Sequence, residues 1–181
     1  MSYITTYGGI HFDPLAPRPE QILAEDIAHA LSLICRGNGH VRRFYSVAQH
    51  SLACSYEAEV RGFSARVQLA CLLHDAAEAY LSDVTRPMKA LMPQLRAAEE
   101  RLLDVIWRRF LDEAPDESER ALVFEIDDDM LSYEFHVLMP EDISDRWRKI
   151  RCAVDTRWEE PEIAAARFEK RLRELSPTVP E

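Results

Sequence analysis

The sequence predicts an all-α protein that folds as a single domain over residues 1–181, and three observations carry this prediction. From about residue 24 onward, apolar residues recur at helical spacing. The stretch densest in glycine and proline lies before that point. The chain has 181 residues, which fits one domain with a sizeable core, and it contains no internal repeat or linker. We therefore expect a bundle of about six or seven helices.

The first residues predict the only extended structure. Tyr3–Thr6 and Ile10–Phe12 flank the pair Gly8-Gly9, an arrangement typical of a short hairpin or loop.

The next part of the chain predicts three helices with polar caps. Asp26, Ser46 and Ser64 each precede apolar residues at helical spacing and are candidate N-caps. The third of these helices is apolar on most sides from Val67 to Ala77. Such a helix belongs in the middle of a bundle.

Prolines divide the remainder. Pro87 and Pro93 interrupt the chain around a turn, and Pro140 ends a long helix. The helices expected in this part are Ala97–Phe110, which is amphipathic, a long helix capped by Asp116 or Ser118 and running to about Leu138, and Ile163–Leu175.

Composition narrows the function classes. The net charge of −10 argues against binding to duplex DNA or to an anionic membrane. No apolar run reaches the roughly 18 residues of a membrane span, and the N-terminus lacks a basic stretch followed by an apolar one. The four cysteines form no CxxC pair. We expect a cytoplasmic protein with reduced cysteines.

The pair His74-Asp75 is the strongest candidate for chemistry. It follows the apolar run ACLL, and a continuous helix would place Glu78 on the same face as His74. Burying three ionisable groups in an apolar helix is costly unless something compensates their charge. A divalent cation is the simplest compensation, because imidazole and carboxylate both ligate such ions.

Further ligands come from other helices. His50 offers an imidazole from the preceding helix, and Ile126–Met130 contains three consecutive aspartates. Consecutive side chains on a helix diverge by about 100°, so one aspartate is expected to face the interior and the other two the solvent. His29 and His136 are interpreted as packing or surface residues.

The sequence around these residues resembles that of a known superfamily. The segments are PRPEQILAEDIAHALS (17–32), RGNGHVRRFYSVAQHS (36–51), LLHDAAEAYLSDVTRPMK (72–89) and EIDDDMLSYEFHVLMP (125–140). They are similar to the HD superfamily of metal-dependent phosphohydrolases, in the branch that includes the bacterial 5'-deoxynucleotidases. The resemblance covers about residues 7–140 and implies an HD-type bundle with its motif core at about residues 24–140.

The resemblance also implies a set of site residues. One divalent ion (Mn, Co, Zn, Fe or Mg) would be held by His50, His74, Asp75 and Asp127. Asp127 is preferred to Asp128 because relatives place a glutamate seven residues after this ligand, where Glu134 stands.

The remaining roles concern water and substrate. Glu78 would be the general base, and Asp83 would position the water or the substrate. Arg36 and Lys89 would hold the phosphate, and His40 is a further candidate for contacting substrate.

The chain departs from the resembling family at two positions. Ser82 stands where relatives usually have glycine, and Asp129 stands where they often have arginine. Neither belongs to the expected ligand set, so both bear on the identity of the substrate.

These residues predict a phosphohydrolase acting on a small phosphorylated molecule, most simply a nucleoside 5'-monophosphate. Two alternatives remain at this stage. One is a metal-stabilised binding or structural protein without turnover, against which Glu78 and Asp83 argue. The other is a di-iron oxygenase, which would need His40 and Glu78 as additional ligands. A homodimer is also expected from the family, with Ala97–Phe110 as a candidate interface.

Overall fold

The computed structural model describes residues 3–141 and 150–176, and within these it confirms an all-α protein. One two-stranded sheet and two short 3₁₀ helices accompany the α-helices. The helices are η1 (Pro19–Gln21), α1 (Ala24–Leu33), η2 (Arg36–Gly39), α2 (Val47–Val60), α3 (Ala65–Leu72), α4 (Glu78–Leu81), α5 (Arg86–Ala90), α6 (Pro93–Leu111), α7 (Glu117–Leu138) and α8 (Pro161–Leu175).

The described residues thus contain eight α-helices, more than the six or seven expected. The difference comes from α4 and α5, which have four and five residues. Pro87 was expected to interrupt the chain but lies in the first turn of α5, where proline is tolerated. Neither helix is long enough to show a helical repeat in the sequence.

The N-terminal hairpin is confirmed. Strands β1 (Ile4–Thr5) and β2 (His11–Phe12) pair antiparallel, with Ile4 opposite Phe12. Phe12 is fully buried, and its ring stacks on that of Tyr80 with 4.2 Å between centroids. The hairpin is therefore attached to the bundle through its second strand.

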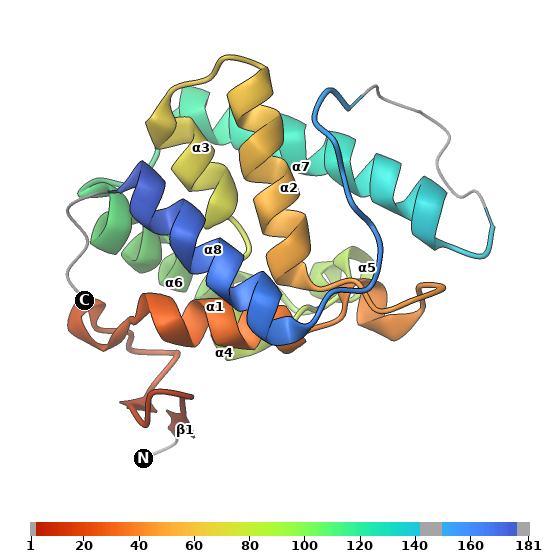
Figure 1. The fold of residues 1–181 in the computed structure, drawn as a ribbon. Helices are drawn as coiled ribbons and strands as arrows, with labels where there is room; N and C mark the ends of the chain where they lie inside the picture. The colour runs from red at the N-terminus through yellow and green to blue at the C-terminus, as the bar shows by residue number, and fades with distance from the viewer. Residues whose placement is uncertain (1–2, 142–149, 177–181) are drawn as a thin grey trace.

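Helix α2 occupies the centre of the bundle. It packs against α1, α3, α7 and α8, and Figure 1 shows it between α8 and α7. Ser46 caps its start as predicted, in a capping box with Gln49. Residues from both ends of α2 are buried, including His50 and Glu57. Buried ionisable side chains are costly without partners, so those of α2 need partners on the neighbouring elements.

Other predicted boundaries have mixed outcomes. Ser64 and Asp116 cap α3 and α7 as expected. The prediction for Asp26 was wrong, because α1 begins at Ala24 and Asp26 lies in its first turn. The Asp26 carboxylate accepts a hydrogen bond from the backbone N–H of Gly8, so it joins the hairpin to α1 instead of capping the helix.

The expectation of one helix running through Ala77 was also wrong. Helix α3 ends at Leu72, and His74 and Asp75 lie in the turn before α4. His74 Nδ1 lies 2.7 Å from the carbonyl oxygen of Cys71, so this carbonyl accepts from a side chain at the point where the helix ends. His74 lies in the turn and Glu78 begins α4, so the two side chains do not share a helix face.

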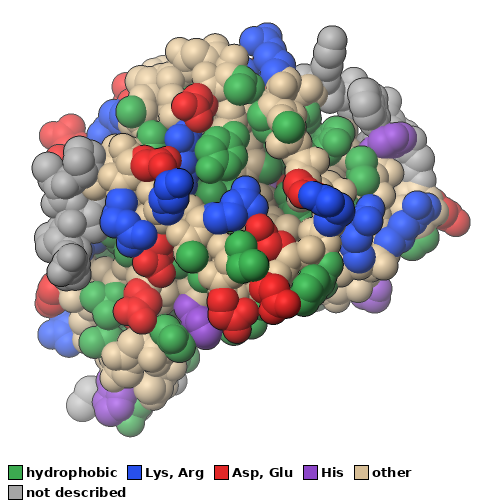
Figure 2. Space-filling view, in the orientation of Figure 1, with side chains coloured by type: hydrophobic (Ala, Val, Ile, Leu, Met, Phe, Trp, Pro, Cys, Tyr) green, Lys and Arg blue, Asp and Glu red, His purple; other side chains and the backbone are tan. Residues whose placement is uncertain are grey.

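The molecular surface around α8 carries both signs of charge. Figure 2 shows basic and acidic side chains next to one another across this face. The helix and the segment before it include the ion pairs Arg167–Glu159 and Arg173–Glu169. Among the described residues, none of the helices combines the length and the apolar character needed to cross a bilayer.

Candidate metal centre

Three elements bring the four expected ligands together. His50 lies on α2, His74 and Asp75 lie in the turn after α3, and Asp127 lies on α7. His50 Nε2 is 3.2 Å from His74 Nε2 and 3.2 Å from Asp127 Oδ1. Asp75 Oδ2 is 3.6 Å from His50 Nε2 and 3.3 Å from His74 Nε2. Two imidazole nitrogens and two carboxylate oxygens therefore converge on one point.

The hydrogen bonds made by the two Nδ1 atoms show that Nε2 is the nitrogen of each imidazole left for a metal. His50 Nδ1 lies 2.9 Å from the carboxylate of Glu134, and His74 Nδ1 lies 2.7 Å from the carbonyl of Cys71. Both partners are acceptors, so each Nδ1 carries the proton. In neutral rings the two Nε2 lone pairs then face each other. Metal-bound histidines commonly show this arrangement, with the second nitrogen donating to a carboxylate or a carbonyl.

The spacing of the converging atoms fits a single ion. Ligand atoms about 2.1 Å from a metal lie about 3.0 Å apart in octahedral geometry and about 3.4 Å apart in tetrahedral geometry. The two Nε2 atoms lie 3.2 Å apart, and each lies 3.2 Å to 3.6 Å from Asp75 Oδ2 and from Asp127 Oδ1. An ion placed between these atoms would reach all four with little movement of the side chains.

The electrostatics of the cluster also favour positive charge. Burial alone would lower the pKa of His74, but Asp75 and Asp127 raise it well above its usual value. Burial alone would raise the pKa of Asp127, yet hydrogen bonds from His50 and His74 hold it well below the usual range. The two carboxylates thus stay ionised and attract a cation to the imidazoles, whether a proton or a metal ion.

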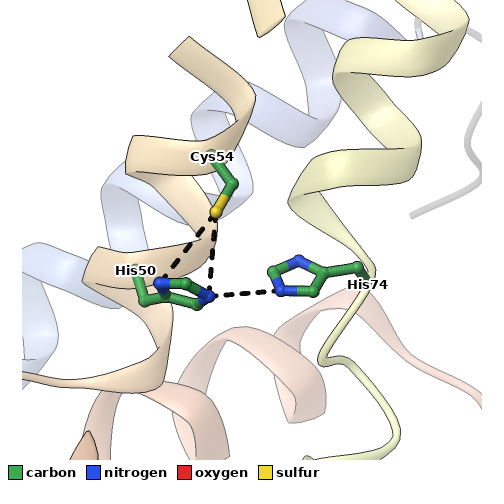
Figure 3. Close-up of side chains that lie close together, drawn as sticks. All are labelled: His50, Cys54 and His74. Carbon is green, nitrogen blue, oxygen red and sulfur yellow. Dashed lines mark hydrogen bonds between the residues drawn. The ribbon is translucent and has the colours of Figure 1, made fainter. Parts of the chain in front are cut away.

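Cys54 is close to the same histidines. His50, Cys54 and His74 form a group whose ligand atoms lie within 4.8 Å of one another and which could hold a metal ion. Figure 3 shows the thiol beside the ring of His50, with Sγ 3.7 Å from Nε2 and 3.9 Å from Nδ1. An atom on the lone-pair axis of Nε2 would be much farther from Nδ1. Cys54 therefore lies against the ring and not where Nε2 would bind a shared ion.

Glu78 is buried beside the cluster. It is 3% exposed, its Oε1 accepts a hydrogen bond from Lys89 Nζ at 3.0 Å, and its Oε2 has no hydrogen-bond partner in the described structure. Burial raises the pKa of Glu78 well above its usual value, and the neighbouring charges of Asp75 and Asp83 raise it further. A buried carboxyl group with a raised pKa is a candidate for general acid–base catalysis.

Asp83 and Arg36 border the same space. Burial raises the pKa of Asp83, which lies within electrostatic range of Arg36 and Asp75. Arg36 is 8% exposed, and its Nη1 lies 3.4 Å from Asp75 Oδ2. Its Nε lies 3.6 Å from Glu134 Oε2. Arg36 therefore neutralises carboxylates on two sides of the cluster.

Lys89 and His40, the other two residues expected to contact substrate, do not both lie at the cluster. Lys89 makes ion pairs with Glu78 and with Glu99, so its ammonium group is already held between two carboxylates. His40 is exposed at the end of η2. The described contacts therefore connect Lys89 with Glu78, while His40 lies on the outer side of the loop that follows Arg36.

The aspartate triplet separates in three directions. Asp127 faces the imidazoles and Asp128 is exposed, as expected for one inward and one outward residue. The expectation that two of the three face solvent was wrong for Asp129, which is 4% exposed and accepts a hydrogen bond from Arg61 Nη2 at 2.8 Å. The reason is tertiary, since Arg61 at the end of α2 lies across from this position.

Sequence reasoning did not foresee that Arg86 and Glu134 contact the expected ligands. Arg86 Nη2 donates to Asp127 Oδ2 at 2.8 Å, and Glu134 accepts from His50 Nδ1. The spacing of seven residues between Asp127 and Glu134 was an available signal, because it places both on one helix face. The contact of Arg86 had no local signal, since it depends on how α5 lies against α7.

Comparisons with known proteins give neither a family nor an activity. No protein-family model matches the chain. It is 40% identical over 110 residues to the uncharacterized protein YfdR of Escherichia coli K12, an alignment that covers 61% of this chain and 59% of YfdR. It is 38% identical over 107 residues to an uncharacterized protein of Rhodobacter capsulatus, covering 56% of this chain and 55% of that protein. The chain thus spans somewhat more than half the length of these relatives.

Proposed function

We propose that this chain is a metal-dependent phosphohydrolase of the HD type that removes phosphate from a nucleoside 5'-monophosphate or a similar small phosphate ester. The observation that carries the proposal is the buried, unpartnered Glu78 Oε2 beside the convergent atoms of two histidines and two aspartates. A purely structural metal site has no need for an additional buried carboxyl group with a raised pKa.

In this proposal His50, His74, Asp75 and Asp127 hold one divalent ion. Four protein ligands leave room on a six-coordinate ion for a water molecule and a phosphate oxygen. The bound ion would supply a water of lowered pKa and charge neutralisation at the phosphoryl group. Nitrogen and carboxylate ligands suit Mn, Co, Fe, Zn or Mg, so the ligand set does not select one metal.

Glu78 handles the proton. Its free Oε2 accepts a proton as the water oxygen attacks phosphorus, and the same carboxyl group can return it to the departing ester oxygen. Lys89 holds Oε1, which fixes the orientation of the carboxyl group. An ammonium group has three N–H donors, and Glu78 and Glu99 account for two of them. The third remains for a phosphate oxygen, while Arg36 and Asp83 border the position of the phosphoryl group.

The test is phosphatase activity on a panel of nucleotides with the protein loaded with Mn, Co or Mg. We expect hydrolysis of at least one phosphomonoester. We expect Glu78→Gln to lower kcat by about 10²-fold or more, which is the usual contribution of a general acid–base residue. Glu78→Gln should retain the metal, because Glu78 is not in the proposed ligand set.

Glu99→Gln is the matched control, since Glu99 is the second carboxylate on Lys89. It should change kcat only a few-fold. If the metal-loaded protein hydrolyses neither a phosphomonoester nor a phosphodiester, the proposed function is wrong, and a metal-stabilised binding protein becomes the better interpretation.

A further inference from the structure

Arg86, the first residue of α5, lies over the outer oxygen of Asp127. Its Nη2 is 2.8 Å from Asp127 Oδ2, and its Nη1 is 2.7 Å from Asp128 Oδ1. One guanidinium thus bridges two consecutive aspartates of α7. Asp127 uses its two oxygens for different purposes, because Oδ1 faces the imidazoles and Oδ2 faces Arg86.

Arg86 differs from the other two cations of the site in its exposure. The side chains of Arg36 and Lys89 are 9% and 22% exposed, and each lies between two carboxylates that are themselves buried or nearly so. The side chain of Arg86 is 59% exposed and that of Asp128 is 56% exposed. An anion that approaches from solvent on the side of α5 meets Arg86 before it meets either of the others.

The ion pair between Arg86 and Asp128 is easy to break. An exposed pair contributes little to stability, because water solvates both groups well when they separate. The guanidinium has five N–H donors arranged as a fork that matches two oxygens of a carboxylate or a phosphate. Arg86 can therefore leave Asp128 for a phosphate oxygen and keep its contact with Asp127.

We propose that Arg86 binds the phosphoryl group of the substrate and that Asp128 competes with the substrate for it. This inference rests on the proposed function, since it assumes a phosphorylated substrate at the cluster. Asp128 holds Arg86 in a resting position next to the ligand Asp127. A phosphate bound at the cluster replaces the Asp128 carboxylate on Nη1, so the strength of one exposed ion pair tunes the affinity for substrate.

The two partners then have opposite effects on KM. Arg86→Ala removes a charge-assisted contact to phosphate, and we expect KM for the best nucleotide to rise about tenfold or more. Asp128→Asn removes the competitor, and we expect KM to fall about two- to fivefold. The double variant should behave like Arg86→Ala, because Asp128 acts through Arg86. A purely structural bridge between α5 and α7 predicts the same direction of change for both single variants.

A binding measurement that needs no turnover separates this inference from the proposed function. Inorganic phosphate titrated calorimetrically into the metal-loaded protein should bind about tenfold more weakly to Arg86→Ala and more tightly to Asp128→Asn. Arg86→Lys should recover only part of the affinity, because an ammonium group lacks the fork.

Arg108→Ala is the matched control for removal of an exposed arginine. Its side chain is 60% exposed and pairs with Asp104 on α6, away from the cluster. It should leave KM and phosphate affinity unchanged. If the wild-type protein hydrolyses nucleotides but Arg86→Ala keeps KM and phosphate affinity, or if Asp128→Asn raises both KM and the dissociation constant, the inference is wrong while the proposed function stands.

Discussion

Helices α2 and α7 enclose two buried groups of charged residues, and the two groups are built differently. The metal-centre cluster (His50, His74, Asp75 and Asp127) lies nearer the start of α2. The second group lies near the end of α2 and consists of Glu57, Arg61 and Asp129. We refer to the second group as the Arg61 cluster.

In the Arg61 cluster the charges are matched by donors and acceptors of the protein itself. Glu57 accepts hydrogen bonds from Arg61 Nε at 2.8 Å and from the backbone N–H groups of Arg151 and Cys152. Arg61 Nη2 donates to Asp129 Oδ2 at 2.8 Å. This cluster is complete without a ligand, and it fastens the segment around Cys152 to α2.

In the metal-centre cluster and beside it, some buried polar atoms are not matched by a donor or an acceptor of the protein. The two Nε2 atoms face each other, and one oxygen of the neighbouring Glu78 has no hydrogen-bond partner among the described residues. The same pair of helices thus supports one closed polar group, which stabilises the fold, and one open group, which is suited to a ligand. The comparison teaches that burial of charge alone does not mark a functional site. What distinguishes the metal-centre cluster is that ionisable side chains from three elements converge on one point beside an unmatched buried carboxylate oxygen.

The largest expected effect is on metal binding. His50→Ala removes one proposed ligand and the partner of Glu134, and we expect the proposed ion to be lost on gel filtration, as measured by elemental analysis. Glu57→Gln, in the Arg61 cluster, should leave the metal content unchanged.

Cys54→Ser tests directly which side chains bind the metal. Retention of metal in Cys54→Ser and its loss in Asp127→Asn are expected, and the reverse pattern would show that the thiol is the ligand.

A smaller effect is expected on stability at the Arg61 cluster. Glu57→Gln removes the charge that three donors share, and we expect the free energy of unfolding in urea to fall by about 3 kcal/mol. Glu125→Gln is the matched control, because Glu125 pairs with the same Arg61 but its side chain is 54% exposed. It should cost less than about 1 kcal/mol. Equal losses in the two variants would contradict the distinction between the buried and exposed partners of Arg61.

The same variant has a defined pH dependence. Burial alone would raise the pKa of Glu57, but hydrogen bonds from Cys152, Arg61 and Arg151 lower it below its usual value. Its contribution is therefore fully present above the unfolded pKa of about 4.3 and is lost as the pH falls through the lower folded pKa. The difference in unfolding free energy between wild type and Glu57→Gln should be constant above about pH 5 and should shrink below about pH 4.

The smallest expected effect concerns the backbone beside the metal-centre cluster. Ser82 has φ 72° and ψ 157°, a conformation that glycine adopts far more readily than serine. The side chain is exposed, so its removal costs little packing. Ser82→Gly should raise the unfolding free energy by about 1 kcal/mol. A lower melting temperature in Ser82→Gly would show that the serine side chain compensates the strain.

Much of the fold was accessible from the sequence because helical repeats and caps are local. The capping residues Ser46, Ser64 and Asp116 and the hairpin at the N-terminus were predicted from a few neighbouring residues each. The end of α3 before His74 was not, because the apolar run continues beyond it. No local pattern signals that a histidine side chain will bind the carbonyl of Cys71 where the helix ends.

At the candidate site, too, some features could be predicted from the sequence and others could not. The sequence by itself determined the all-α class, and residue type and position indicated His50, His74 and Asp75 as possible metal ligands. The resemblance to the HD superfamily selected Asp127 among the three adjacent aspartates. Only the tertiary structure decided how these residues are used. The approach of α7 to α2 sends Asp127 to the imidazoles and Asp129 to Arg61, and the position of α5 places Arg86 on Asp127. These choices depend on contacts between residues far apart in the chain, which no local pattern encodes.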